Sequence, residues 1–143
     1  DTILFYAFNQ YIFNPQKQKN YTKSKNRKEG VINYGKGISE FYRDEKGVYN
    51  YTYQHDVFDI PYLNSQSKER TGYATQKPKQ LIERIIKVSS NENDLVGDFY
   101  LGSGTTAVVC KELNRNFIGC DISKKAIDIT NKRLYENENS LFK

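Results

Sequence analysis

Two aspartates on either side of a glycine-rich turn are the residues of this chain best suited to chemistry. Asp98 ends one apolar run, Gly102-Ser103-Gly104 follows it, and Asp121 ends a second apolar run. Glycine lets the backbone come close to a ligand, and a helix that begins at such a turn offers unpaired amide groups. These residue types at this spacing predict a nucleotide-like pocket made of backbone amides and two carboxylates.

Several regular elements must position this turn. The sequence predicts a helix from Pro78, a strand over 94–100, a helix over 104–113, a strand over 116–121, and a helix that Ser123 caps and that runs to about residue 136. The right-handed crossover rule makes the two strands parallel neighbours. Since two strands do not make a stable sheet, we expect further strands from residues 2–6 and from polypeptide outside the chain. The predicted fold class is α/β, part of a three-layer Rossmann-like sheet.

Three ligand classes compete for the turn, and a tight turn without any ligand is a further alternative. A phosphate-binding P-loop needs Lys after its second glycine, where this chain has Ser103. The glycines match a dinucleotide fingerprint, but Asp98 would repel a pyrophosphate, and more strands would have to follow Asp121. A cofactor with an ammonium group and no phosphate fits better, because Asp98 can pair with the ammonium and Asp121 with two ribose hydroxyls. S-adenosylmethionine has these features.

Four segments carry a family resemblance. They are the loop Asp98–Thr106, the Thr-Gln-Lys-Pro motif within 71–78, and the stretches 56–61 and 117–122. In this order they resemble the permuted, beta-class-like DNA amino-methyltransferases of restriction-modification systems, well over residues 55–136 and loosely over 1–14. The resemblance implies S-adenosylmethionine as methyl donor and an exocyclic amino group in double-stranded DNA as acceptor. We expect adenine N6, with cytosine N4 as the alternative.

The resemblance also assigns a cofactor site. The predicted cofactor-binding residues are Thr75, Lys77, Asp98, Tyr100, Leu101, Gly102, Ser103, Gly104, Thr105, Thr106, Asp121 and Ile122. It places Asp98 at the methionine end, Asp121 at the ribose, and Thr75 with Lys77 near the methionine carboxylate. A lysine charge would neutralise that carboxylate, although a solvent-exposed lysine at a helix start is the alternative for Lys77.

One motif of the family is missing from this sequence. The family's Asp/Asn/Ser-Pro-Pro-Tyr/Phe motif holds the target amine and stacks on the flipped base. Pro15, Pro61 and Pro78 are the chain's three prolines, and no two are adjacent. Ile60-Pro61-Tyr62 is not a substitute, because it lacks the polar acceptor. We therefore predict no catalytic residue in this chain, and expect a C-terminal part of the enzyme that does not methylate DNA by itself.

A basic and aromatic region separates two parts of the predicted core. We expect a core strand within 1–13, an irregular target-recognition segment over 14–60, and the cofactor-binding part over 61–143. Lys23, Lys25, Arg27 and Lys28 are the tentative DNA-binding residues, through phosphates, and neighbouring tyrosines could stack on bases. A solvated, mobile loop is the alternative. Within this region the alternating residues 48–53 are typical of an edge strand.

Composition limits the remaining classes. The net charge of +5 is compatible with nucleic acid, and no apolar run reaches the roughly 18 residues of a membrane span, so we expect a cytoplasmic protein. Cys110 and Cys120 are expected to be buried free thiols, and a single histidine, His55, argues against a metal site. The candidate protein partners are a second copy of the chain, in a homodimer, or a restriction subunit. A nicotinamide-dependent oxidoreductase fragment and a non-catalytic DNA-binding module remain as alternative functions.

Overall fold

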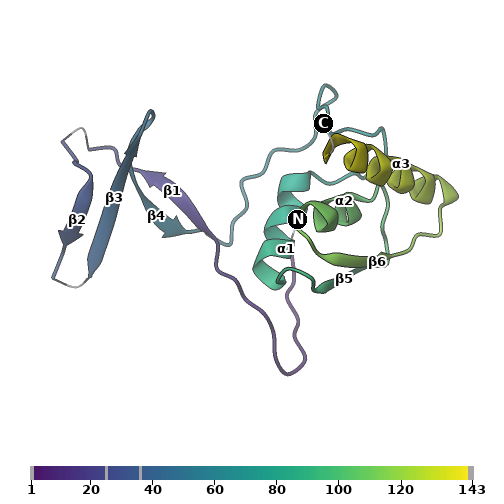
Figure 1. The fold of residues 1–143 in the computed structure, drawn as a ribbon, viewed down its shortest axis with the longest axis horizontal. Coiled ribbons are helices and arrows are strands. Elements are labelled where there is room, and N and C mark those ends of the chain that lie inside the picture. The colour runs from purple at the N-terminus through teal and green to yellow at the C-terminus, as the bar shows by residue number, and fades with distance from the viewer. Residues whose placement is uncertain (1, 25, 36, 142–143) are drawn as a thin grey trace. The chain divides into compact units, whose positions relative to one another are not determined.

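The computed structural model describes residues 2–24, 26–35 and 37–141, and it divides the chain into two compact units (Figure 1). One unit comprises Asp1–Asn14 with Phe58–Lys143, and the other comprises Pro15–Val57. The first contains the predicted turn and is called the cofactor unit below. The second is called the sheet unit.

The cofactor unit has the predicted order of helices and strands. Its elements are α1 (Lys79–Ser89), β5 (Leu95–Asp98), α2 (Thr105–Glu112), β6 (Asn116–Gly119) and α3 (Lys124–Leu141). β5 and β6 pair in parallel, with Asp98 opposite Gly119, so the predicted parallel pairing is confirmed. Ser123 caps α3, because its Oγ accepts a hydrogen bond from the Ala126 amide at 3.4 Å.

Apolar side chains of α1 and α2 form the core of this unit. Ile86, Val109 and Cys110 are buried together, and Ile82 and Val96 pack against them. Burying a side chain such as Val or Ile contributes about 1.5–3 kcal/mol each, which explains why α1 turns its isoleucine face inward. Burial raises the pKa of the Cys110 thiol to about 11, so the thiol stays neutral.

Two expectations for the cofactor unit are wrong. Cys120 is a free thiol but is exposed, because it lies where β6 gives way to a loop. Residues 2–6 form no strand, and Leu4 and Phe5 are 68% and 63% exposed. A buried strand needs a paired neighbour, and within the described residues β5 and β6 pair only with each other. The apolar composition of residues 2–6 therefore does not specify a strand by itself.

The sheet unit corrects the expectation of an irregular segment. It contains β1 (Lys17–Tyr21), β2 (Gly30–Asn33), β3 (Ile38–Asp44) and β4 (Gly47–Tyr53). These form one antiparallel sheet in the order β1-β4-β3-β2 (Figure 1). β4 is therefore an internal strand with a neighbour on each side, and not the edge strand that its alternation suggested. The alternating residues of β4 reflect the two faces of the sheet, which differ in how far their side chains are buried.

Turn chemistry explains the central hairpin of the sheet unit. β3 and β4 are joined by a two-residue turn, in which Asp44 Oδ1 accepts the Lys46 amide at 3.0 Å. Gly47 follows with a φ of 130°, a conformation that glycine adopts without strain.

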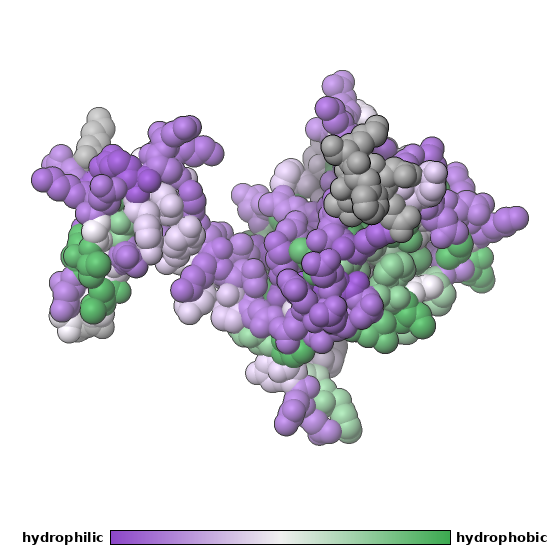
Figure 2. Space-filling model, in the orientation of Figure 1, coloured by the Kyte–Doolittle hydropathy of each residue, from purple (hydrophilic) through white to green (hydrophobic). Residues whose placement is uncertain are grey.

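The β2–β3 hairpin exposes hydrophobic residues, as Figure 2 shows. Val31 is 66% exposed and Ile38 is 71% exposed.

Candidate cofactor site

The two predicted acids lie at the same edge of the parallel strand pair. Asp98 is the last residue of β5, and Asp121 follows the end of β6 by two positions. The Cys120 amide donates to the Asp98 carbonyl at 3.1 Å, and the Leu101 amide donates to the Cys120 carbonyl at 3.1 Å. Through these bonds the structure brings Asp98, the start of the glycine loop and Asp121 together. Such carboxyl ends of parallel strands are where open α/β sheets bind ligands.

Backbone amides hold the Asp121 carboxylate in place. Its Oδ1 accepts the Ser123 amide at 2.8 Å, and its Oδ2 accepts the Gly102 amide at 2.8 Å. These bonds, that from Ser123 first, keep the pKa of Asp121 below its ordinary value. Each carboxylate oxygen can accept more than one hydrogen bond, so an ionised Asp121 can bind the glycine loop and ligand hydroxyls together.

Asp98 is half-buried and is oriented by the residue that follows the strand. Its Oδ1 accepts the Tyr100 amide at 3.1 Å, which leaves the carboxylate aligned with the turn. Beside the two acids, large side chains are strongly exposed, Tyr100 at 93% and Ile122 at 105%. The edge therefore combines two fixed acceptors with apolar and aromatic surface, the usual composition of a small-molecule site.

The two glycines of the loop serve different contacts. Gly104 has a φ of 73°, and a Cβ on it would lie 2.4 Å from Thr130 Oγ1 on α3. Gly102 has a φ of 55°, and a Cβ there would lie 3.3 Å from the Tyr73 ring. Gly104 is thus required by the close approach of α3 as well as by its backbone angle. The second glycine of the dinucleotide-like pattern, Gly104, is therefore explained by its packing against Thr130.

Arg133 of α3 holds the inner side of the glycine loop. Its Nη1 donates to the Ser103 carbonyl at 2.6 Å, to Thr105 Oγ1 at 3.1 Å and to Ser103 Oγ at 3.4 Å. Ser103 and Thr105 are only 4% and 5% exposed, so both side chains point into the protein. Burial lowers the pKa of Arg133, but a guanidinium keeps its charge at neutral pH.

The backbone of the Thr-Gln-Lys-Pro segment contacts Thr105, the first residue of α2 after the glycine loop. The Lys77 carbonyl accepts a hydrogen bond from Thr105 Oγ1 at 3.3 Å. The Gln76 side chain fixes the segment, because it accepts from the Thr71 amide at 2.8 Å and donates to the Glu69 carbonyl at 2.7 Å. The side chains of Thr75 and Lys77 are exposed.

The remaining predicted residues are divided between interior and surface. Leu101 is 7% exposed and packs beneath the loop near Gly119, and Thr106 is half-buried in the first turn of α2.

The sequence did not lead us to select Tyr73, Thr130 or Arg133. Ala126, Thr130 and Arg133 are spaced i, i+4, i+7, which places them on one helix face. That spacing was the available signal, but small and charged residues rarely indicate a buried face.

The predicted DNA-binding residues of the sheet unit differ in their surroundings. Arg27 is half-buried, with its guanidinium carbon 4.8 Å from the centre of the Phe41 ring. The guanidinium of Arg27 therefore packs on an aromatic ring, and its role at DNA phosphates stays a prediction. Lys23 and Lys28 are exposed, and Lys25 lies outside the described residues.

Comparison with known proteins defines the class. A sequence model of the N6/N4 family described as DNA methylase matches residues 1–132, so the chain belongs to that family. It is 58% identical over 59 residues to Type II methyltransferase M1.MboII of Moraxella bovis, covering 41% of this chain and 23% of that protein. It is 46% identical over 79 residues to Type II methyltransferase M.HpaI of Haemophilus parainfluenzae, covering 55% and 25%.

A third relative belongs to the same class of enzyme. Type II methyltransferase M2.DpnII of Streptococcus pneumoniae is 51% identical over 84 residues, covering 58% of this chain and 31% of that protein. The chain thus spans about a quarter to a third of the curated relatives that it matches. The crystal structure of an M1.HpyAVI–SAM complex is similar at 34% identity with a TM-score of 0.47, covering 62% of this chain and 50% of that one. Among the described residues, no helix has the length and apolar character of a membrane span.

Proposed function

We propose that the cofactor unit holds much of the S-adenosylmethionine pocket of a site-specific DNA methyltransferase. The observation that carries this proposal is the shared edge where Asp98, the glycine loop and Asp121 meet. Membership of the DNA methylase family supports the reaction class, and the Type II relatives support a cytoplasmic enzyme of a restriction-modification system. The acceptor in the proposal is the N6 amino group of adenine in double-stranded DNA.

The residues at the edge fit the chemical groups of this cofactor. Asp121, ionised and fixed by two amides, accepts hydrogen bonds from the ribose hydroxyls. Asp98 attracts the ammonium of the methionine portion, and the exposed Tyr100 and Ile122 provide apolar surface for the adenine ring. The bound cofactor supplies an electrophilic methyl group. The chain's own residues bind and orient the molecule that carries it.

Other predicted residues act through the loop or at its margin. Ser103 and Thr105 support the backbone from inside, because Arg133 and the Lys77 carbonyl engage them. The backbone of Gly102 and Gly104 shapes the turn from which the cofactor is held. In this proposal Thr75 and the Lys77 ammonium lie near the methionine carboxylate of the cofactor. A charge-assisted contact there favours an anion over a neutral group.

The sheet unit is the proposed target-recognition part. Its 43 residues, Pro15–Val57, contain nine of the 22 Lys and Arg residues and five of the 17 Asp and Glu residues. The difference is a net charge of +4, out of +5 for the whole chain. A positive unit attracts the phosphate backbone regardless of sequence. Of the predicted set, Lys23 and Lys28 are the exposed lysines that we propose as phosphate contacts.

Transfer itself needs groups that this sequence does not contain. The chain has no adjacent prolines and therefore no Asp/Asn/Ser-Pro-Pro-Tyr/Phe motif. We propose that this chain alone does not methylate DNA, and that methylation occurs in a longer polypeptide that includes it. Transfer of labelled methyl groups from S-adenosylmethionine to DNA by the purified 143-residue chain would contradict this proposal.

Calorimetry with S-adenosylhomocysteine and with NAD tests the cofactor assignment. We expect heat with S-adenosylhomocysteine and none with NAD. Asp121→Ala should abolish that heat, because it removes the ribose acceptor, whereas Asp128→Ala, an exposed acid on α3, should leave it unchanged. Heat with NAD alone would favour the oxidoreductase alternative. In the longer enzyme, Asp98→Ala should abolish methylation, and full activity would mean that the pocket is vestigial.

A further inference from the structure

One face of the sheet unit gathers five tyrosines. The strand register sets Lys17 opposite Tyr53, Lys19 opposite Tyr51, and both Tyr21 and Tyr42 opposite Tyr49. Residues directly opposite each other in an antiparallel sheet project from the same side. We name this surface the tyrosine face, which consists of Lys17, Lys19, Tyr21, Tyr42, Tyr49, Tyr51 and Tyr53.

The rings of the tyrosine face support each other but are not covered. The ring centres of Tyr49 lie 5.4 to 5.7 Å from those of Tyr21, Tyr42 and Tyr51. Tyr53 is 60% exposed and Tyr51 48%, whereas the central Tyr49 is 8% exposed. Neighbouring rings restrict each other's motion, so they can contact a partner with little loss of side-chain entropy.

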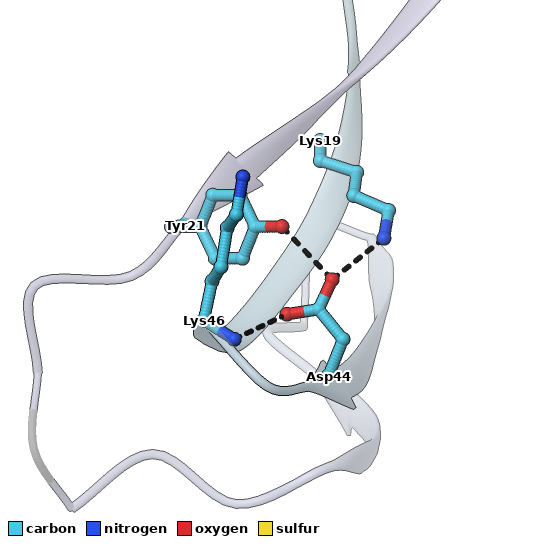
Figure 3. A network of polar contacts seen from close by, with 4 residues as sticks. All are labelled: Lys19, Tyr21, Asp44 and Lys46. Atoms are coloured by element: carbon cyan, nitrogen blue, oxygen red, sulfur yellow. Dashed lines mark hydrogen bonds and ion pairs between the residues drawn. The ribbon is translucent and has the colours of Figure 1, made fainter.

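A polar network keeps the negative charge on this face compensated. Asp44 Oδ2 accepts hydrogen bonds from Lys19 Nζ at 2.6 Å and from the Tyr21 hydroxyl at 2.9 Å, while Oδ1 accepts the Lys46 amide (Figure 3). The bond from Lys19 is the main reason that the pKa of Asp44 lies below its ordinary value. The carboxylate therefore faces a cation in the sheet itself and repels an approaching phosphate less than a bare acid would.

The charge of the sheet unit lies mostly outside the tyrosine face. Lys17 and Lys19 are balanced by Asp44 and by Glu40, whose carboxylate accepts the Tyr42 hydroxyl at 2.7 Å. The net charge of +4 of the unit therefore comes from basic residues elsewhere, including Lys23 and Lys28. In this small unit, the basic residues that attract phosphates are therefore different from the tyrosines that offer ring surfaces.

We propose that the tyrosine face contacts the sugars and base edges of DNA, while Lys23 and Lys28 contact the phosphates. This proposal rests on the proposed recognition role of the sheet unit. Contacts to phosphates release counterions and give binding its salt dependence, whereas ring contacts to the sugars and base edges of a duplex do not. Loss of a ring therefore weakens binding equally at every salt concentration, and loss of a lysine changes the slope.

Fluorescence anisotropy with a fluorescein-labelled duplex of mixed sequence tests this division, using the whole chain at several salt concentrations. Tyr53→Ala should raise the Kd about tenfold with an unchanged salt slope. Tyr53→Phe should stay within about twofold, because it keeps the ring. The matched control is Tyr34→Ala in the β2–β3 turn, a ring that is 53% exposed but outside the tyrosine face. Lys23→Ala with Lys28→Ala should reduce the slope by up to about two.

Each outcome has a defined meaning. If the Kd of Tyr53→Ala equals that of Tyr34→Ala while the lysine variant changes the slope, the tyrosine face is not the contact, although the recognition role of the unit stands. If Tyr53→Ala lowers the thermal midpoint, Tyr53→Leu decides, since it keeps apolar bulk without the ring and should still raise the Kd. If the wild-type chain does not bind the duplex, the recognition role fails too, independently of the S-adenosylhomocysteine titration. A face covered by a second copy, seen as a dimer by sedimentation, would also overturn the proposal.

Discussion

The glycine loop and the tyrosine face are both held in place by side-chain contacts, but these contacts are buried in the loop and exposed in the tyrosine face. The loop is held from beneath, by the buried side chains of Ser103 and Thr105 and the guanidinium of Arg133. The tyrosine face is held from the side, by rings and an ion pair that remain exposed. Buried polar bonds are costly to leave unmade, and exposed pairs are worth little. The loop should therefore be sensitive to single substitutions that the sheet tolerates.

Replacing Gly104 by Ala should have the largest effect. The new Cβ would lie within 2.8 Å of three side-chain atoms of Thr130, at a residue whose φ is 73°. We expect a loss of about 3 kcal/mol in the free energy of unfolding, measured by urea denaturation. Gly37→Ala is the control, since a Cβ there meets nothing within 4 Å, and it should cost less than about 0.5 kcal/mol. Equal losses in the two variants would remove the packing argument.

Replacing Arg133 by Ala should have the next largest effect. It leaves the buried oxygens of Ser103 and Thr105 without their donor, which should cost about 2–3 kcal/mol in the free energy of unfolding. Lys132→Ala, in the preceding position and exposed, should cost at most about 0.5 kcal/mol. S-adenosylhomocysteine titration of both variants should show weaker binding for the Arg133 variant only. Unchanged binding would mean that Arg133 stabilises α3 without positioning the loop.

Acid should remove the contribution of Asp121. Its pKa is lower in the folded state than in the unfolded chain, so its stabilisation is complete above the unfolded value of about 3.9 and is lost as pH falls through the folded value. The stability difference between the wild type and Asp121→Asn should therefore shrink below about pH 4. Urea midpoints of the two proteins across this pH range measure it. A difference that does not depend on pH would show that the charge of Asp121 is unimportant for the loop.

The smallest effect is expected in the tyrosine face. Asp44→Asn removes the ion pair with Lys19, whose side chains are 28% and 40% exposed. The urea midpoint should hardly move, because exposed pairs are screened by water and salt. A shift as large as that of the Arg133 variant would mean that the sheet, like the loop, depends on single polar contacts, and the contrast between the two regions would disappear.

The parts of the fold that the sequence could predict are those with apolar runs ended by turn residues. The runs before Asp98 and Asp121 and the helical spacing of Ile82, Ile85 and Ile86 led to β5, β6 and α1. In contrast, every residue of β1 (Lys17–Tyr21) is exposed, so it has no apolar alternation to recognise. Its strand character comes from pairing with β4, which is a property of the folded sheet and not of the segment.

The site shows the same limit. The acids and glycines were predictable because a glycine turn between two strands that each end in an acid is typical of a ligand-binding edge. Arg133 was not, because a single Arg in a helix usually lies in solvent, and only its hydrogen bonds to Ser103 and Thr105 distinguish it. The tyrosines were anticipated as a composition, but the sequence did not indicate which of them share a face. Only the strand register places Lys17 and Lys19 beside the rings.

The contacts of α3 with the loop also constrain how this chain can change in length. Ser123 begins the helix, Thr130 fills the space above Gly104, and Arg133 reaches the loop, so their separations along the helix are fixed together. One inserted or deleted residue between Ser123 and Thr130 would turn both later side chains by about 100° around the helix axis. Insertions and deletions should therefore be selected against between Ser123 and Arg133, and accepted more readily after Arg133.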